Sequence, residues 1–192
     1  MAHIKENLAP AGVVTDARML RTRKALREAL LALIERKQLD EITIRDIAAE
    51  AGIGYATFFR HHGSKADLLD DVAAEQIAQL MARTLPLMES TDTKAGCRAL
   101  AEYVHANRAI WSALLTGGAS GAMRETFIRM SVQGAAHIKT LSWLPVELGA
   151  VFGVGATVEI LAWWLRRPDE VSTEQIAEIL HRLVVMPTVG SG

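Results

Sequence analysis

Apolar residues recur at helical spacing along nearly the whole chain. Runs of alternating β-branched residues bounded by turns, which are typical of strands, do not occur in the sequence. The pattern therefore predicts an all-α protein of about nine helices. These helices are predicted at residues 17–37, 43–50, 54–61, 65–84, 93–106, 107–116, 120–140, 146–167 and 173–186.

Local signals delimit the helices of the first third. The hydroxyl of Thr43 can cap the second helix, and Asp46 three residues later completes a pair of the capping-box type. Gly52 is expected to end that helix in the left-handed conformation. Pro86 is expected to stop or bend the fourth helix. The small core of this region is predicted to contain Ile44, Ile47, Ile53 and Phe58.

Charge is divided unevenly along the chain. Residues 1–65 hold 11 Lys and Arg against 8 Asp and Glu, a net charge of +3, whereas residues 66–192 hold 10 against 14, a net charge of −4. The first helix begins with a cationic cluster, which opposes the helix dipole and is explained by a nearby polyanion; a solvated charged face is the alternative. The cluster consists of Arg18, Arg21, Arg23, Lys24 and Arg27.

Cys97 is the sole cysteine, so the chain can form neither an intramolecular disulfide nor a cysteine-based zinc cage. The first sixteen residues lack the apolar run of a signal peptide and are expected to form a mobile arm of a cytoplasmic protein. Residues 148–165 are apolar enough to suggest a membrane span, but Glu159 within them favours a buried helix of a soluble protein. No membrane association is expected.

Residues 42–65 read ITIRDIAAEAGIGYATFFRHHGSK. Two short helices joined across residues 51–53 can cross closely because Ala48 and Gly52 are small. This is the arrangement of a helix-turn-helix, which holds its second helix rigidly for insertion into the DNA major groove; an ordinary helical hairpin is the alternative. The outward positions of the second helix are Tyr55, Ala56, Thr57, Phe59, Arg60 and His61.

The segment from Ala51 to Lys65, AGIGYATFFRHHGSK, resembles the DNA-binding signature of the tetracycline-repressor (TetR) family of bacterial regulators. The family pattern also matches Arg21-Thr22-Arg23 and the apolar helix that follows these three residues. The resemblance is specific over residues 20–70 and only architectural beyond. It implies a three-helix N-terminal DNA-binding domain and a C-terminal helical domain that binds an effector and dimerises.

The resemblance also implies roles for individual side chains. Arg45 and Tyr55 would lie near base edges, and Thr57 would lie at bases or phosphate. His61 and Lys65 would bind phosphate. The predicted DNA-binding residues are Arg21, Arg45, Tyr55, Thr57, Phe59, Arg60, His61 and Lys65.

Two residues depart from the family pattern. Phe59 stands where the family usually has a tyrosine, so a phosphate hydrogen bond from this position is not available. A phenylalanine can still contact a thymine methyl group or a sugar. Gly54 replaces the usual serine cap.

Patterns for catalysis and for metal binding are weak. His61 and His62 are adjacent, so they point about 100° apart on a helix and cannot share a metal as an i, i+4 pair can. Ser120 does not match a nucleophile elbow, and Gly153-Val154-Gly155 follows no predicted strand and lacks a third glycine. Neither an enzyme, a metal site nor a cofactor is expected.

The rear half contains many large and adaptable side chains, most of which must be core. The resemblance implies a cavity among its helices that binds a small apolar or amphipathic effector, and such cavities favour aromatic and methionine linings with a few polar groups. The sequence does not identify the effector. The candidate lining residues are Tyr103, His105, Trp111, Phe127, Met130 and His137.

Residues 146–186 are predicted to form a long helix and a shorter one, which from two subunits could make a four-helix bundle. The long helix carries a stripe of small residues and the shorter one an apolar stripe. Packing within one subunit is the alternative, and the resemblance favours the dimer. The candidate interface residues are Gly149, Gly153, Ala156, Ile160, Ile176, Ile179, Leu180 and Leu183.

The predicted organisation is an arm (1–16), a helix-turn-helix domain (17–65), an effector-binding and dimerisation domain (66–186) and a tail (187–192). The predicted function is that of a ligand-responsive repressor, which binds palindromic double-stranded operator DNA as a homodimer and is released by a small molecule. The helix at 65–84 would transmit the change. A DNA-binding activator or architectural regulator without an effector, and a helical enzyme, are the alternatives.

Overall fold

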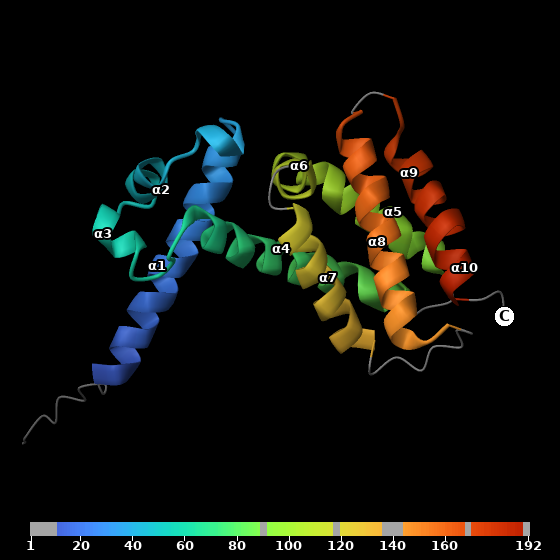
Figure 1. Ribbon diagram of the computed structural model, residues 1–192, viewed down its shortest axis with the longest axis horizontal. Helices are drawn as coiled ribbons and strands as arrows, with labels where there is room; N and C mark the ends of the chain where they lie inside the picture. The colour runs from blue at the N-terminus through green and yellow to red at the C-terminus, as the bar shows by residue number, and fades with distance from the viewer. Residues whose placement is uncertain (1–10, 89–91, 117–119, 136–143, 168–169, 190–192) are drawn as a thin grey trace, which may run out of the picture. The chain divides into compact units, whose positions relative to one another are not determined.

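A computed structural model describes residues 11–88, 92–116, 120–135, 144–167 and 170–189. Within these ranges every regular element is a helix and none is a strand, which confirms the all-α prediction (Figure 1). The elements are α1 (Ala11–Ile34), η1 (Leu39–Glu41), α2 (Ile44–Glu50), α3 (Tyr55–Phe58), α4 (Lys65–Met88), α5 (Thr93–Ala106), α6 (Arg108–Thr116), α7 (Ser120–Ala135), α8 (Val146–Leu165), α9 (Thr173–Leu180), η2 (His181–Val185) and α10 (Met186–Val189).

Each predicted helix has a counterpart, but several differ in extent. Helix α3 is shorter than the predicted 54–61, and α1 ends at Ile34 and not at residue 37. The end predicted for the helix at 120–140 lies outside the described residues. Helix α1 begins at Ala11, so residues 11–16, expected to belong to the arm, are helical. Helix α4 runs past Pro86 to Met88; because the proline lies in the last turn, few main-chain hydrogen bonds remain for it to disrupt. The last predicted helix is divided by a single π-helical turn, η2, into α9 and α10.

The chain divides into two compact units, residues 1–68 and residues 69–192. In the first unit, α1 packs against α2 and α2 against α3. Its core is made of fully or almost fully buried aliphatic side chains from α1, α2 and the segment before α2, and of one aromatic ring. These core residues are Leu26, Leu30, Ile42, Ile47 and Phe58.

The second unit is a bundle in which α5 packs against α9 and α7 against α8, as Figure 1 shows. Helix α6 contacts both α7 and α8. Two tryptophans, Trp111 on α6 and Trp164 on α8, are its largest fully buried side chains. The indole N–H of Trp164 donates to the carbonyl of Val171 at 2.8 Å, which satisfies the donor inside the core.

Helix α8 is buried along one side only. Its Glu147–Leu165 segment, with a mean hydropathy of 1.6, is long and apolar enough to cross a membrane by length and composition, and 39% of the segment is buried. Val158 and Leu161 face the core, whereas Phe152 and Trp163 are exposed. The predicted burial therefore holds for one side of α8, whereas the other side keeps exposed apolar side chains.

Candidate nucleic-acid interface

Helix α2 starts at the predicted capping box. The Thr43 backbone N–H donates to an Asp46 carboxylate oxygen at 2.9 Å, and the Asp46 N–H donates to the Thr43 hydroxyl at 3.1 Å. The hydrogen bond from the Thr43 backbone, assisted by nearby Lys37, lowers the pKa of Asp46 below its usual value. Two main-chain donors at the helix start are thereby satisfied, which confirms the prediction.

The turn after α2 depends on Gly52, whose φ of +65° lies in the left-handed region. An added Cβ would meet no atom within 4 Å, so backbone conformation and not crowding requires the glycine. Gly52 is exposed, whereas Ala48 is buried. The left-handed turn is confirmed, but of the two small residues predicted at the crossing only Ala48 is enclosed.

Phe58 anchors the short helix α3. Its side chain is fully buried, as is that of Ile47 on α2, while Ile44 and Ile53 are not fully buried. The buried ring determines the orientation of α3, because a four-residue helix has too few internal hydrogen bonds to hold its own position. Tyr55, at the start of α3, is left exposed.

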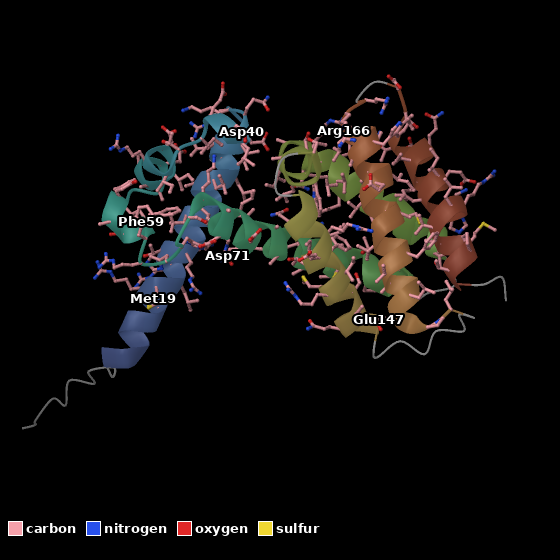
Figure 2. The ribbon with its side chains drawn as sticks, viewed as in Figure 1. Met19, Asp40, Phe59, Asp71, Glu147 and Arg166 are labelled. Atoms are coloured by element: carbon pink, nitrogen blue, oxygen red, sulfur yellow. The ribbon has the colours of Figure 1, made fainter. Side chains whose placement is uncertain are left out.

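Arg45, Tyr55 and Phe59 form a continuous exposed surface, here termed the aromatic strip. The Arg45 guanidinium lies 5.8 Å from the centre of the Tyr55 ring, a cation–π contact. The Tyr55 and Phe59 rings meet edge to face at 5.2 Å. Tyr55 is 50% and Phe59 44% exposed; Phe59 is labelled beside α3 in Figure 2. Such exposure of two large rings in a small domain points to a binding surface.

A second feature, here termed the cationic cleft, is an open hollow of about 750 Å³ in the first unit. The first half of α1, the turn at residues 52–54 and the region of α3 line it, and none of the described lining residues is acidic. The Arg60 guanidinium donates to the Thr57 hydroxyl at 2.8 Å. The lining residues are Arg18, Met19, Thr22, Gly52, Ile53, Gly54, Thr57, Arg60 and His61.

His61 is the histidine among the described residues that line the cationic cleft. Its Nδ1 atom is buried and has no hydrogen-bond partner in the described part of the chain. Burial lowers the pKa of His61 below its usual value, and the charges of Arg23, His62 and Arg60 lower it further. An anion bound nearby would favour the protonated ring and reverse this shift.

Lys65 has a role inside the first unit that the sequence did not indicate. Its ammonium donates to the carbonyl oxygens of Leu39 and Ile42, each at 2.9 Å. These bonds tie the start of α4 to the segment that precedes α2, across more than twenty residues. The Lys65 ammonium is thus engaged within the first unit, and not directed outward as the phosphate contact implied by the resemblance would require.

Comparison with known proteins finds one family model that matches the N-terminal part of the chain. Residues 26–72 match the model of the bacterial regulatory proteins of the tetR family. The match runs from α1 into α4, so this likeness covers the helix-turn-helix region and about a quarter of the chain. Over these residues the chain is similar to the DNA-binding domains of bacterial regulatory proteins.

The curated and solved relatives agree with this family. An uncharacterized HTH-type transcriptional regulator, YxbF of Bacillus subtilis (strain 168), is 37% identical over 67 residues, which cover 34% of this chain and 18% of YxbF. NalD, the secondary repressor of the MexAB-OprM multidrug efflux pump in Pseudomonas aeruginosa, is 20% identical, with a TM-score of 0.60 over 90% of this chain and 99% of NalD.

A further solved structure, FadR of Thermus thermophilus, is described as a TetR-family transcriptional repressor in complex with lauroyl-CoA. It is 16% identical, with a TM-score of 0.66 over 88% of this chain and 96% of FadR. At these identities the solved structures show a shared fold. This shared fold includes the helical second unit as well as the first unit.

Replacing Lys65 by methionine should lower the free energy of unfolding of the tetR-type domain by about 1.5–3 kcal/mol, because two carbonyls would no longer have a charged donor. Hydrogen exchange of the α2 and α3 amides measures this decrease. Lys24→Met, which removes only an exposed ion pair with Glu28, should change the value by less than about 0.5 kcal/mol. If stability is unchanged and the salt dependence of DNA binding becomes shallower, Lys65 contacts a DNA phosphate instead.

In the second unit, Tyr103 borders a pocket of about 410 Å³ between α4 and α5. Its hydroxyl lies 3.0 Å from a side-chain oxygen of Gln76 and 3.1 Å from one of Gln79, and the Arg83 guanidinium lies 5.2 Å from the ring centre. Burial raises the pKa of Tyr103. Of the candidate lining residues, Tyr103 is the one that borders this pocket, which is completed by Gln79, Arg83, Ala99, Glu102, Ala106 and Asn107.

The other candidates for the effector cavity are dispersed. Trp111 is buried in the core, and its indole N–H has no acceptor in the described part of the chain. Phe127 and Met130 are half-buried on α7. His105 is exposed and stacks on Trp164, with ring centres 6.0 Å apart, so it does not line the pocket beside Tyr103. His137 lies outside the described residues.

The apolar stripe predicted on α9 is used within the subunit. Ile176 is 0% and Leu180 2% exposed, because α9 packs against α5. Gly153 faces the same subunit as well, since a Cβ there would lie 3.9 Å from Val184. Ile176 and Leu180 are enclosed by their own subunit and cannot form a surface toward a partner, which corrects the prediction for these two residues. Gly153 itself is half-buried. Half-buried positions are Gly149, Ala156, Ile160 and Ile179.

Only Leu183 among the predicted interface residues is fully open, at 60% exposure. Sequence reasoning missed the other exposed apolar side chains of α8 and α10, although their spacing along α8 was visible. With Leu183 they form a set here termed the α8 apolar face. Its members are Leu148, Val151, Phe152, Trp163, Leu183 and Met186.

Proposed function

We propose that this chain is a dimeric repressor, which binds palindromic operator DNA through its tetR-type domain and releases it when a small molecule binds the second unit. The observation that carries the proposal is the pairing of two surfaces at the same short helix. One is the exposed aromatic strip, and the other is the cationic cleft without acidic lining among its described residues.

The two surfaces suit different parts of a DNA duplex. In the aromatic strip, Arg45 can reach a guanine edge in the major groove while Tyr55 contacts neighbouring bases. The cationic cleft presents Arg18, Arg60 and His61, which suit phosphate oxygens. Phosphate contacts supply affinity that weakens steeply with salt, and base contacts supply sequence preference.

The α8 apolar face supports the dimer. Monomeric proteins seldom leave so many large apolar side chains uncovered on one set of helices. A two-fold axis through α8 would bring each face against its own copy, as the isologous interface of a dimer requires. The dimer would place two recognition helices on successive major grooves, roughly 34–36 Å apart.

The second unit supports the effector. Its pocket beside Tyr103 combines a buried hydroxyl, a guanidinium and an amide, the kinds of polar groups that orient a ligand. Helix α4 begins in the first unit and continues into the second, so a shift of α4 can carry the signal. A coupling of about 1–3 kcal/mol between effector and DNA would suffice for release. The regulator would act in the cytoplasm, where its operator lies.

Selection from a random duplex library tests the proposed function. The wild-type protein should enrich a palindrome, and affinity for it should exceed that for unrelated DNA by at least about a thousandfold. A reporter placed behind this palindrome should be silenced; activation would reverse the sign of regulation. Compounds that raise the melting temperature should reduce binding in a gel shift. The absence of any enriched motif would refute the proposed operator binding.

DNA affinity should rise as the pH falls through the titration of His61. In the free protein the lowered pKa keeps the ring neutral near pH 7. A bound phosphate would raise that pKa, so the complex would take up as much as one proton per subunit, and affinity would increase between the pKa of the complex and that of the free protein.

Titration of the dissociation constant from about pH 8 to about pH 6 at constant ionic strength measures this linkage, because the usual histidine pKa lies in that window. His61→Gln should remove the slope, whereas His105→Gln, a change at an exposed histidine of the second unit, should retain it. A slope that persists in His61→Gln would place the proton elsewhere.

A further inference from the structure

We propose that Phe59 recognises the 5-methyl group of a thymine in each operator half-site. Sequence preference at that base pair would then come from an apolar contact and not from a hydrogen bond. The inference rests on the proposed operator binding and specifies one part of it, namely a base and the atom that is read.

The Phe59 ring is exposed but held in place. It meets the Tyr55 ring at 5.2 Å with an interplanar angle of 72°, and the Phe58 ring at 5.4 Å with an angle of 76°. Phe58 is fully buried in the domain core. Edge-to-face contacts with two neighbouring rings restrict the Phe59 ring, so a contact with DNA would cost little conformational entropy.

The charges around the ring indicate a polyanion as the occupant. Arg45 lies against Tyr55 within the aromatic strip, and Arg60 follows Phe59 in the chain and lines the cationic cleft. An apolar protein partner would gain nothing from these guanidinium groups. A DNA major groove satisfies both features, because phosphates flank its base edges.

Within the major groove, the chemistry of phenylalanine selects one group. The side chain can neither donate nor accept a conventional hydrogen bond, so it cannot read the N7, O6, N6, N4 or O4 atoms of the bases. The 5-methyl of thymine is the apolar group displayed there. Polar edges placed against the ring would give up their hydration without compensation, which disfavours other bases at this position.

The test is a deoxyuridine scan of the palindrome enriched by the wild-type protein. Replacing a thymine by deoxyuridine removes one methyl group and leaves every hydrogen-bonding atom in place. Removal of a buried methyl should weaken binding about fourfold for one half-site and about sixteenfold when both half-sites carry the change. We expect this weakening at one thymine position per half-site that depends on Phe59.

Side-chain variants test whether Phe59 is the residue that contacts this methyl group. Phe59→Ala should bind the thymine and the deoxyuridine duplexes equally at the sensitive position, whereas Phe59→Leu, which keeps an apolar side chain, should retain part of the difference. Leu20→Ala removes an exposed apolar side chain of α1 outside the strip and the cleft; it should retain all of it. Circular dichroism confirms that each variant is folded.

The outcomes separate the two proposals. An enriched palindrome with no deoxyuridine effect, or an effect unchanged in Phe59→Ala, would overturn the thymine assignment and leave operator binding intact. Equal weakening of every sequence by Phe59→Ala would also overturn it, because that result indicates packing on sugars. Failure to enrich any motif would overturn operator binding itself, and this inference with it.

Discussion

Replacing Arg60 by glutamate is expected to lower the affinity for every DNA duplex by on the order of a hundredfold or more. A charge-assisted phosphate contact contributes about 1.5–3 kcal/mol, and a symmetric dimer makes it twice. The introduced carboxylate also repels phosphate. Arg60 is exposed and its guanidinium donates to the hydroxyl of nearby Thr57 at the surface, so the domain core does not depend on it and folding should be unaffected.

Fluorescence anisotropy across a range of salt concentrations measures this effect. The slope of log affinity against log salt should become shallower by about 0.9 for each phosphate that the variant no longer neutralises. Arg60→Lys, which keeps the charge, should retain most of the affinity, and Arg166→Glu, a reversal at an exposed arginine of the second unit, should leave binding unchanged. A decrease confined to one sequence would show that Arg60 reads bases.

Replacing Phe152 by glutamate is expected to convert the dimer to a monomer at micromolar concentration. Phe152 is 48% exposed on the α8 apolar face, so the variant can fold as a single subunit. In a dimer, the carboxylate would be buried against its mate without a partner, at a cost of several kcal/mol. Affinity for a full palindrome should then fall far more than affinity for a half-site.

Sedimentation equilibrium decides the point. Leu20→Glu makes the same kind of change on an exposed leucine of α1 and should remain dimeric. Gly153→Glu is a poorer test, because Gly153 is only half-buried and its Cβ would lie against Val184 of the same subunit, so the variant could act within the subunit as well as at an interface. A folded Phe152→Glu protein that stays dimeric would remove the α8 apolar face from the interface.

The sequence predicted the local features of this protein because they depend on residues three or four apart. Helical periodicity located helices α1 to α9, and the Thr43–Asp46 pair and Gly52 located the turn of the helix-turn-helix. Capping, left-handed turns and amphipathic spacing are short-range effects, so a linear pattern records them directly. The family resemblance over the same stretch depended on these residues as well.

Contacts between distant residues were decided by the tertiary structure. The bonds from Lys65 to the carbonyls of Leu39 and Ile42 leave no periodic trace, because any lysine on that helix would look the same in sequence. The cationic cleft likewise joins Arg18 on α1 to His61, more than forty residues later. Sequence indicated positive charge in both segments but not that they enclose one hollow.

The apolar stripe on α9 shows most clearly what a sequence pattern cannot determine. An apolar stripe at helical spacing requires that one face of a helix be covered, and Ile176 and Leu180 met that requirement. The hydrophobic effect is non-directional, so the pattern cannot state whether the cover comes from the same chain or from a partner. Tertiary packing covered these residues with α5 of their own subunit and left Phe152 and Leu183 exposed.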